Sequence, residues 1–298
     1  MSSTKFALPN RSASKGGVSL PARGGAWRRL QRHPLLLASL IFLIVIHLLA
    51  FVGPLFWTVS PEAADPLNSL APPSLSQPLG SDDLGRDELS RILYGGRVTL
   101  LVGFAAMATS VVLGSTIGAL GAFYGGWTDR VLMRLTDALM AVPNFFLIVV
   151  AVTVVGTGPL TLILVIGATS WMQVARVVYG ETLRWKTSEF VTAAEACGAS
   201  RARLLWRHVL PQAVPSVIVS ATLGVGWAVL TESAVSYLGL GIQAPMPSWG
   251  NMLQNAQQYV WTAPTLAVYP GVAITLVVLA YNFLGDGLRD VLDPRLRT

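Results

Sequence analysis

The sequence predicts an all-α membrane protein with six spanning helices, and three observations support this fold class. The chain of 298 residues is 53% hydrophobic and only 12% charged, whereas soluble domains carry about 25% charged residues. Its apolar residues are grouped in runs of the length that a spanning helix needs, roughly 20 residues. No stretch alternates at the period of a strand. A backbone in hydrocarbon must satisfy its own hydrogen bonds, so we expect helices.

The predicted spans follow one another as a single domain. They cover residues 34–57, 98–123, 131–156, 159–178, 213–238 and 265–284. Residues 34–298 therefore form one transmembrane domain. Residues 1–33, rich in Ser, Gly and Arg, are expected to be a disordered tail. The first apolar run has 24 residues, longer than the 7–15 of a signal-peptide core, so we expect it to remain as a membrane anchor.

The distribution of Lys and Arg predicts the orientation of the spans. Seven basic residues and no acid lie in residues 1–33, and 18 of the 21 Lys and Arg fall on the same predicted side of the membrane. Cytoplasmic segments carry this excess, so both termini are expected in the cytoplasm. Segments 58–97 and 239–264 then lie outside. Topology thus explains the net charge of +6, and we expect no nucleic-acid partner.

Several kinds of chemistry lack the residues they need. A phosphate-binding loop requires Gly-Lys-Ser/Thr, but the three lysines follow Thr4, Ser14 and Trp185. Neither a Gly-x-Ser-x-Gly elbow nor a His-Glu-x-x-His zinc motif is present. Three scattered histidines and an acidic loop without calcium-binding spacing predict no metal site. We therefore expect no enzyme and no cofactor on this chain.

A polar segment, residues 188–211, separates the fourth and fifth spans. Ser188 is expected to cap a short helix that Gly198 ends in the left-handed conformation. Ser200 is expected to cap a second helix, and Pro211 to end or kink it. Two interpretations follow from these residues alone: the segment lies as an amphipathic helix at the membrane surface, or it offers a docking surface to a partner.

The spacing in this segment resembles the cytoplasmic loop of ABC-importer permeases. Their pattern is Glu-Ala-Ala, three residues, Gly, nine residues, Ile, one residue and Leu-Pro. Here Thr192-Ala193-Ala194 is followed at the same spacing by Gly198, His208 and Leu210-Pro211. Thr192 replaces the Glu, which removes a carboxylate that could bond the partner. His208 replaces the Ile, as in the peptide and nickel branch of the family.

Four further segments resemble the same branch in the same order. They are residues 77–87, 236–241, 247–253 and 282–297. The resemblance covers about residues 30–298 and is to the second, "C"-type, permease subunit of dipeptide and oligopeptide importers. It implies the type I ABC-importer permease fold and a place in a bacterial cytoplasmic (inner) membrane.

The resemblance also implies a function and partners. The chain would form half of the pathway for peptides delivered by an extracytoplasmic solute-binding protein, or for nickel or glutathione-like solutes. Its partners would be a second homologous permease and two P-loop ATPases, which would hold ATP and Mg. The coupling loop 188–211 would sit in an ATPase groove. The residues expected there are Thr192, Ala193, Ala194, Glu195, Gly198, Ala199, Arg203, His208, Leu210 and Pro211.

Two acidic residues lie inside predicted spans. Glu232 must face the bundle interior, where it either contacts substrate or bonds neighbouring helices. Asp137 is three residues from Arg134, which favours a helical ion pair over a substrate role. A transporter working alone could instead use both carboxylates for ion coupling, and a membrane scaffold without transport is a third class. Neither alternative requires the spacing of residues 192–211.

Small residues in the second predicted span indicate close helix packing. Gly114 and Gly118 share one helix face, which Gly121 extends. Such a face lets two backbones approach closely. The packing partner is either another helix of this chain or the partner permease.

Overall fold

The computed structural model describes residues 34–292, which form helices joined by loops, the longest of them residues 57–87. The long helices are α2 (Pro34–Phe56), α3 (Glu88–Tyr124), α4 (Gly126–Met140), α5 (Asn144–Val155), α6 (Pro159–Trp185), α9 (Leu210–Tyr237) and α11 (Thr265–Leu292). The short ones are α7 (Glu189–Ala196), α8 (Arg201–Arg203) and α10 (Trp249–Ala256). Within the described residues only an isolated bridge, between Ser81 and Asp87, has strand pairing. The predicted tail, residues 1–33, lies outside the described residues.

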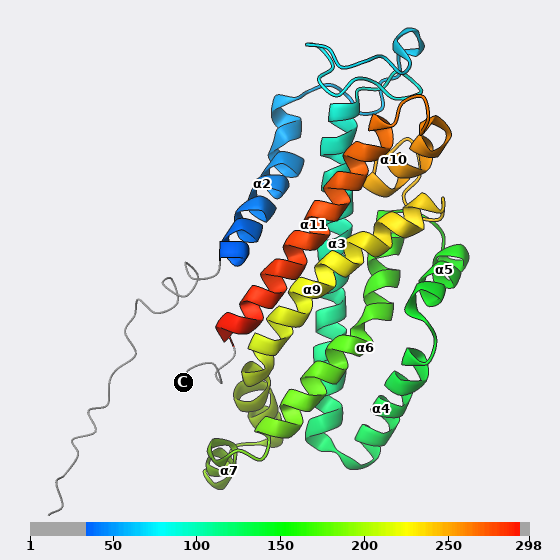
Figure 1. Ribbon diagram of the computed structural model, residues 1–298. Helices are drawn as coiled ribbons and strands as arrows, with labels where there is room; N and C mark the ends of the chain where they lie inside the picture. Colours follow the sequence, from blue (N-terminus) through cyan, green and yellow to red (C-terminus); the bar gives the residue numbers. More distant parts are fainter. Residues whose placement is uncertain (1–33, 293–298) are drawn as a thin grey trace, which may run out of the picture.

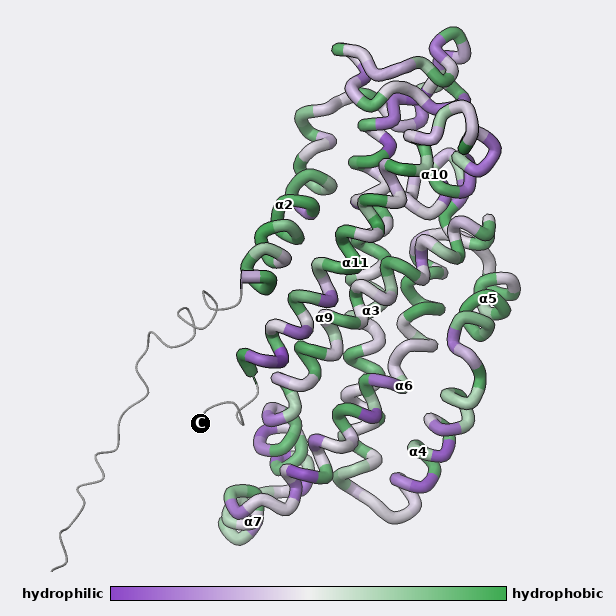
Figure 2. Tube along the Cα trace, viewed as in Figure 1, coloured by the Kyte–Doolittle hydropathy of each residue, from purple (hydrophilic) through white to green (hydrophobic). Residues whose placement is uncertain are grey.

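The bundle is built around α3. This helix packs against α6, α9 and α2, while α11 packs against α9 and α2. Figure 1 shows α7 and the turn between α3 and α4 at one end of the bundle, whereas α2 begins and α11 ends part of the way towards that end. The loop 57–87 and α10 lie at the opposite end. Figure 2 shows hydrophobic residues along the middle of the long helices and more polar residues towards both ends.

Glycines on α3 allow α3 and α6 to touch backbone to backbone. A Cβ at Gly118 would lie 2.3 Å from the carbonyl oxygen of Ala175, and a Cβ at Gly114 would lie 2.5 Å from that of Trp171. Both distances are far below van der Waals contact, so only glycine fits at these positions. The small face predicted in this span therefore packs within the chain, against α6.

The third predicted span is not one continuous helix. Residues 126–140 and 144–155 form α4 and α5, which are bent by 89° at the break between them. Pro143 precedes α5 with ψ of 123°. Proline lacks an N–H group and disfavours the helical conformation of the residue before it, which explains the break. Within residues 34–292, five helices are long and apolar enough to span a membrane, or six if this pair is one broken span.

Other boundaries differ because helices continue past the membrane. The helix α3 starts at Glu88, ten residues before the predicted 98, and α6 and α11 run to Trp185 and Leu292. A helix of 37 residues is about 55 Å long, against roughly 30 Å of hydrocarbon. Apolar runs predict the part of a helix in lipid, not its polar extensions.

Candidate functional site

The inner segment, residues 188–211, begins with the short helix α7 and a glycine turn. Gly198 has φ of +84°, and the N–H groups of Gly198 and Ala199 donate to the carbonyls of Glu195 and Ala194 at 2.9 and 3.1 Å. This pair of bonds is the Schellman ending of a helix. The left-handed glycine predicted at position 198 is confirmed.

The two predicted serine caps differ in outcome. The Ser200 hydroxyl accepts from the N–H of Arg203 at 3.4 Å, as predicted. The Ser188 hydroxyl instead donates to the carbonyl of Trp185 at 2.6 Å, and makes no cap bond to α7. That prediction was wrong, because the Ser188 hydroxyl is directed at the carbonyl of Trp185 at the end of α6 and not at the N–H groups of α7.

The inner segment continues into α9 without a break. The N–H of Leu210 donates to the carbonyl of Leu205, five residues back, so residues 204–209 form a π turn. Pro211 follows in the first turn of α9, where a missing N–H is tolerated. Pro211 therefore does not end the helix. Residues 201–237 form one helical run of 37 residues.

A small apolar cluster holds the inner segment against the bundle. Val191 from α7 packs with Leu204 and Val209, and the cluster includes Phe123 and Trp185 from the ends of α3 and α6. Lys186 donates to the carbonyl of Ala122 at 2.7 Å, which ties the same two helix ends together. The segment is therefore a packed element with a fixed shape.

The opposite face of the inner segment is free in this subunit. Phe190 is 41% exposed and Trp206 is 48% exposed. Four of the predicted coupling residues are half-buried, namely Ala194, Ala199, His208 and Leu210. The other six are exposed, namely Thr192, Ala193, Glu195, Gly198, Arg203 and Pro211. A folded element that exposes two aromatic rings and small side chains has the character of a docking surface.

Glu232 is fully buried at the other end of α9, with 0% exposure. The Ser236 hydroxyl donates to its carboxylate at 2.8 Å, and the hydroxyls of Thr99 on α3 and Ser248 also contact it. Ser248 caps α10 in a capping box with Asn251. Glu232 therefore lies where α9, α3 and the start of α10 meet, and this position favours the structural one of the two roles considered from the sequence.

Asp137 has a different partner from the one expected. Its carboxylate pairs with Arg176 of α6, rather than with Arg134 on its own helix. This cross-helix pair joins α4 to α6. An Arg inside a predicted span needs an acidic partner, and that rule applied to Arg176 would have found the pair.

Glu181 on α6 is a further polar contact that the sequence analysis missed. Its carboxylate accepts from the Ser216 hydroxyl of α9 at 2.8 Å and from the Trp185 indole at 3.1 Å. The contact lies just inside the helix ends, beside the inner segment. The sequence signals for it are local, namely Arg184 and Trp185 at three and four residues from Glu181.

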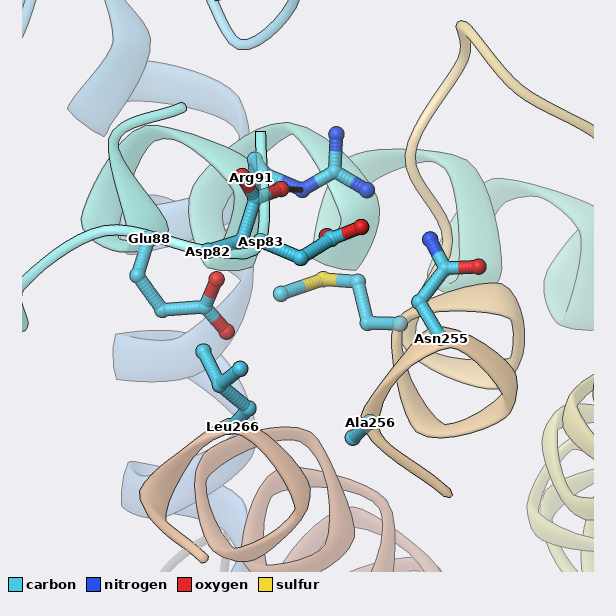
Figure 3. Close-up of a pocket in the computed structure, with 8 residues that line it drawn as sticks. Asp82, Asp83, Glu88, Arg91, Asn255, Ala256 and Leu266 are labelled. Carbon is cyan, nitrogen blue, oxygen red and sulfur yellow. Dashed lines mark ion pairs between the residues drawn. The ribbon is translucent and has the colours of Figure 1, made fainter. Parts of the chain in front are cut away.

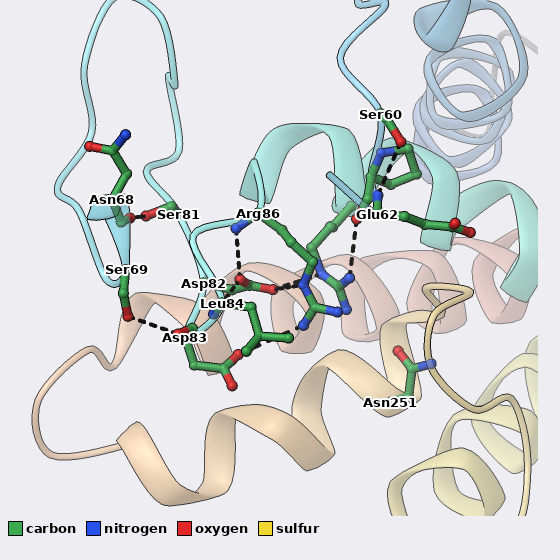
Figure 4. A network of polar contacts seen from close by, with 12 residues as sticks. Ser60, Glu62, Asn68, Ser69, Ser81, Asp82, Asp83, Leu84, Arg86 and Asn251 are labelled. Carbon is green, nitrogen blue, oxygen red and sulfur yellow. Dashed lines mark hydrogen bonds and ion pairs between the residues drawn. The ribbon is translucent and has the colours of Figure 1, made fainter. Parts of the chain in front are cut away.

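A buried ionic network organises the outer loop, residues 57–87 (Figure 4). Asp82 accepts from the guanidinium Nε of Arg86 at 2.6 Å and of Arg91 at 3.2 Å. The same carboxylate accepts from the backbone N–H groups of Leu84 and Arg86, each at 2.9 Å. The sequence analysis did not predict that this loop has a buried charged core.

The small cavity beside this network is not a ligand site. Glu88 and Arg91 line it together with side chains of α10 and α11, as Figure 3 shows. Its volume is about 10 Å³, enough for about one water molecule. This cavity is therefore too small to hold a ligand larger than water.

Long apolar helices, with a packed polar segment between two of them and a buried ionic loop at one end, define a multi-span helical membrane protein. Residues 110–298 match the family described as "Binding-protein-dependent transport system inner membrane component", and residues 23–73 match the "N-terminal TM domain of oligopeptide transport permease C". The chain belongs to this family of permease components of binding-protein-dependent transport systems. The family indicated by residues 192–211 is confirmed.

Curated relatives extend along nearly the whole chain. The dipeptide transport system permease protein DppC of Alkalihalophilus pseudofirmus is 37% identical over 92% of this chain and 90% of its own length. The glutathione transport system permease protein GsiD of Pectobacterium atrosepticum is 38% identical over 91% of each chain. The oligopeptide transport system permease protein OppC of Bacillus subtilis is 37% identical over 91% of this chain and 89% of its own. These relatives are transport subunits rather than enzymes.

A solved structure supports the fold. A chain of the MetNI methionine ABC transporter in an inward-facing conformation aligns with a TM-score of 0.53 at 21% identity. The alignment covers 67% of this chain and 95% of that chain. At this identity the likeness establishes the permease fold alone.

Proposed function

We propose that this chain forms one half of the translocation pathway of an ATP-driven importer for peptides, working with a second homologous permease. A solute-binding protein delivers the peptide to the end that carries α10, outside the cytoplasm. Two P-loop ATPase chains, which hold ATP and Mg, bind the inner segment in the cytoplasm. The α4–α5 pair is then one broken span, giving six spans in a bacterial inner membrane with both termini inside.

One observation carries this proposal. The inner segment is packed at its base, exposed on its far face and continuous with α9, so a displacement of α7 moves a rigid helical run of 37 residues. At the outer end of that run Glu232 accepts from Ser236 of α9 and lies beside Thr99 of α3 and Ser248 at the start of α10. An ATPase that binds the inner segment differently in its two states can therefore bias the outer end.

Dipeptides or oligopeptides are the substrate class we propose, since two of the three relatives compared above are named for them. Glutathione, itself a small peptide, is the alternative supported by a named relative; a nickel chelate has no such support. We propose ATP-driven transport over ion coupling through Glu232 and Asp137, since Glu232 accepts from Ser236 of its own helix and Asp137 is paired with Arg176.

A charge on the exposed face of α7 tests the coupling role. Ala193→Glu adds a carboxylate where the side chain is exposed, so the subunit should fold and insert normally. We expect ATP-dependent uptake to fall at least tenfold in membranes that contain the whole transporter. We also expect the ATPases to be lost when the variant complex is purified. Thr128→Glu, at an exposed position in the first turn of α4 and outside the inner segment, is the matched control. Uptake that survives Ala193→Glu unchanged would contradict the proposal.

A further inference from the structure

A cavity of about 220 Å³ lies where α3, α6 and α9 meet. Ser170 and Gln173 of α6 and Ser220 of α9 supply its polar lining, and Met107, Leu223 and Trp227 supply most of the rest. Each of these residues lies near the middle of its helix. The cavity is therefore at the depth of the membrane centre.

The polar side chains in this cavity have unused hydrogen-bonding capacity. The Ser170 hydroxyl donates to the carbonyl of Ile166 at 2.6 Å, which leaves its oxygen free to accept. Within residues 34–292 neither the Gln173 amide nor the Ser220 hydroxyl has a hydrogen-bond partner. Polar groups left free at the membrane centre face water or protein rather than lipid.

The lining is also neutral. None of the residues that form the cavity carries a charge, and the nearest charged residue along α6, Arg176, pairs with Asp137 of α4. A Gln amide offers both donors and an acceptor, and a Ser hydroxyl offers one donor and an acceptor. This is the complement that a peptide group needs, since it presents one N–H and one carbonyl.

The size of the cavity indicates that it forms one wall of a ligand site and not the whole site. Cavities that enclose a small ligand measure about 300–1,000 Å³, so 220 Å³ is too small to hold a dipeptide alone. Trp227 is 37% exposed at the edge of the cavity, which leaves the side away from α3 open.

We propose that this cavity is the place where a translocating peptide contacts this subunit through its backbone, with Gln173 and Ser220 exchanging hydrogen bonds with peptide groups. The neutral lining makes the passage indifferent to the charge of the peptide's side chains. The proposal rests on the function proposed above and adds to it the residues and the chemistry of the contact.

Cysteine labelling tests the cavity without any transport measurement. Gln173→Cys and Ser220→Cys, in membranes containing the assembled transporter, should react with both a cationic and an anionic water-soluble methanethiosulfonate at comparable rates. Leu48→Cys, on an exposed apolar face of α2, should remain unlabelled. Cys197 is exposed, so its labelling, located by peptide mapping, shows in every sample that the reagent reached the protein. Unreactive Gln173→Cys beside reactive Cys197 would overturn the proposal and indicate that protein covers this face.

A charge placed in the cavity tests the contact with substrate. Gln173→Glu should raise the ratio of uptake rates for a lysine-containing over a glutamate-containing dipeptide by on the order of tenfold. Asn282→Asp on α11, outside the cavity and also an amide-to-acid change in a spanning helix, should leave the ratio unchanged. Ser220→Asp repeats the test if Gln173→Glu does not insert. An unchanged ratio in an inserted, transporting variant would refute the contact, whereas wild-type membranes without ATP-dependent uptake would refute the importer itself.

Discussion

The Ser236 hydroxyl donates to the Glu232 carboxylate at 2.8 Å and at the same time accepts from the backbone N–H of Ile242 at 3.0 Å. One hydroxyl thus links a buried acid on α9 to the loop that leads to α10. Because Ser248 at the start of α10 contacts the same carboxylate, the loop 239–248 is fastened at both ends. Glu232 is a positioning residue of the outer end.

Removing the Glu232 carboxylate should loosen this loop. Glu232→Ala leaves buried hydroxyls without an acceptor, which costs about 1–3 kcal/mol for each unsatisfied group. We expect a lower unfolding temperature for the purified complex and new protease cleavage within residues 239–248. Thr222→Val, on α9 but bonded only to its own helix, is the control. An unaltered cleavage pattern in Glu232→Ala would refute this role.

The Asp137–Arg176 pair should be detectable by a double-mutant cycle. Asp137→Asn and Arg176→Gln each remove one partner, and both side chains are partly exposed, at 48% and 39%. The expected coupling energy is therefore about 0.2–1 kcal/mol, read from the unfolding temperature. The cycle of Asp137→Asn with Arg134→Gln is the comparison and should be additive. Coupling to Arg134 and not to Arg176 would reverse the assignment.

Close packing of α3 on α6 predicts strict size limits at two glycines. Gly118→Ala places a Cβ 2.3 Å from a backbone oxygen, and such overpacking costs about 1–3 kcal/mol. Gly180→Ala, where nothing lies within 4 Å of the added Cβ, should be neutral. The amount of folded protein recovered from the membrane measures both effects. Equal recovery of the two variants would contradict the packing.

Asp82 should matter more than its neighbour Asp83. Asp82→Ala removes the acceptor for two buried guanidinium groups, and uncompensated buried charge costs about 3–5 kcal/mol. Asp83 is more exposed and lies 3.7 Å from Arg86, so Asp83→Ala should have little effect. Protease sensitivity of the loop 57–87 is the readout. Equal sensitivity in the two variants would argue against a buried network.

Some features were predictable from the sequence because they depend on local rules. Apolar runs predicted the apolar parts of α2, α3, α6, α9 and α11. The spacing around Gly198 predicted both the left-handed turn that ends α7 and the permease family. The break at Pro143 also had a local signal, the proline itself. The apolar residues on both sides of it nevertheless led to the prediction of one continuous span.

Other features depend on which helices meet in space. The partners of Asp137 and Glu232, the burial of Arg91 and the alignment of Gln173 with Ser220 all join residues far apart in the chain. The missing cap bond of Ser188 has a similar origin, since the Ser188 hydroxyl donates to the carbonyl of Trp185, where α6 ends. A single sequence does not say which helix faces which.

The most direct test of the account is to purify this chain from its native membrane in mild detergent and identify the proteins that accompany it. The account predicts a second homologous permease and P-loop ATPases, and predicts that Ala193→Glu loses the ATPases while keeping the permease. A stable complex that contains no ATPase, and that still transports peptides in vesicles, would contradict it.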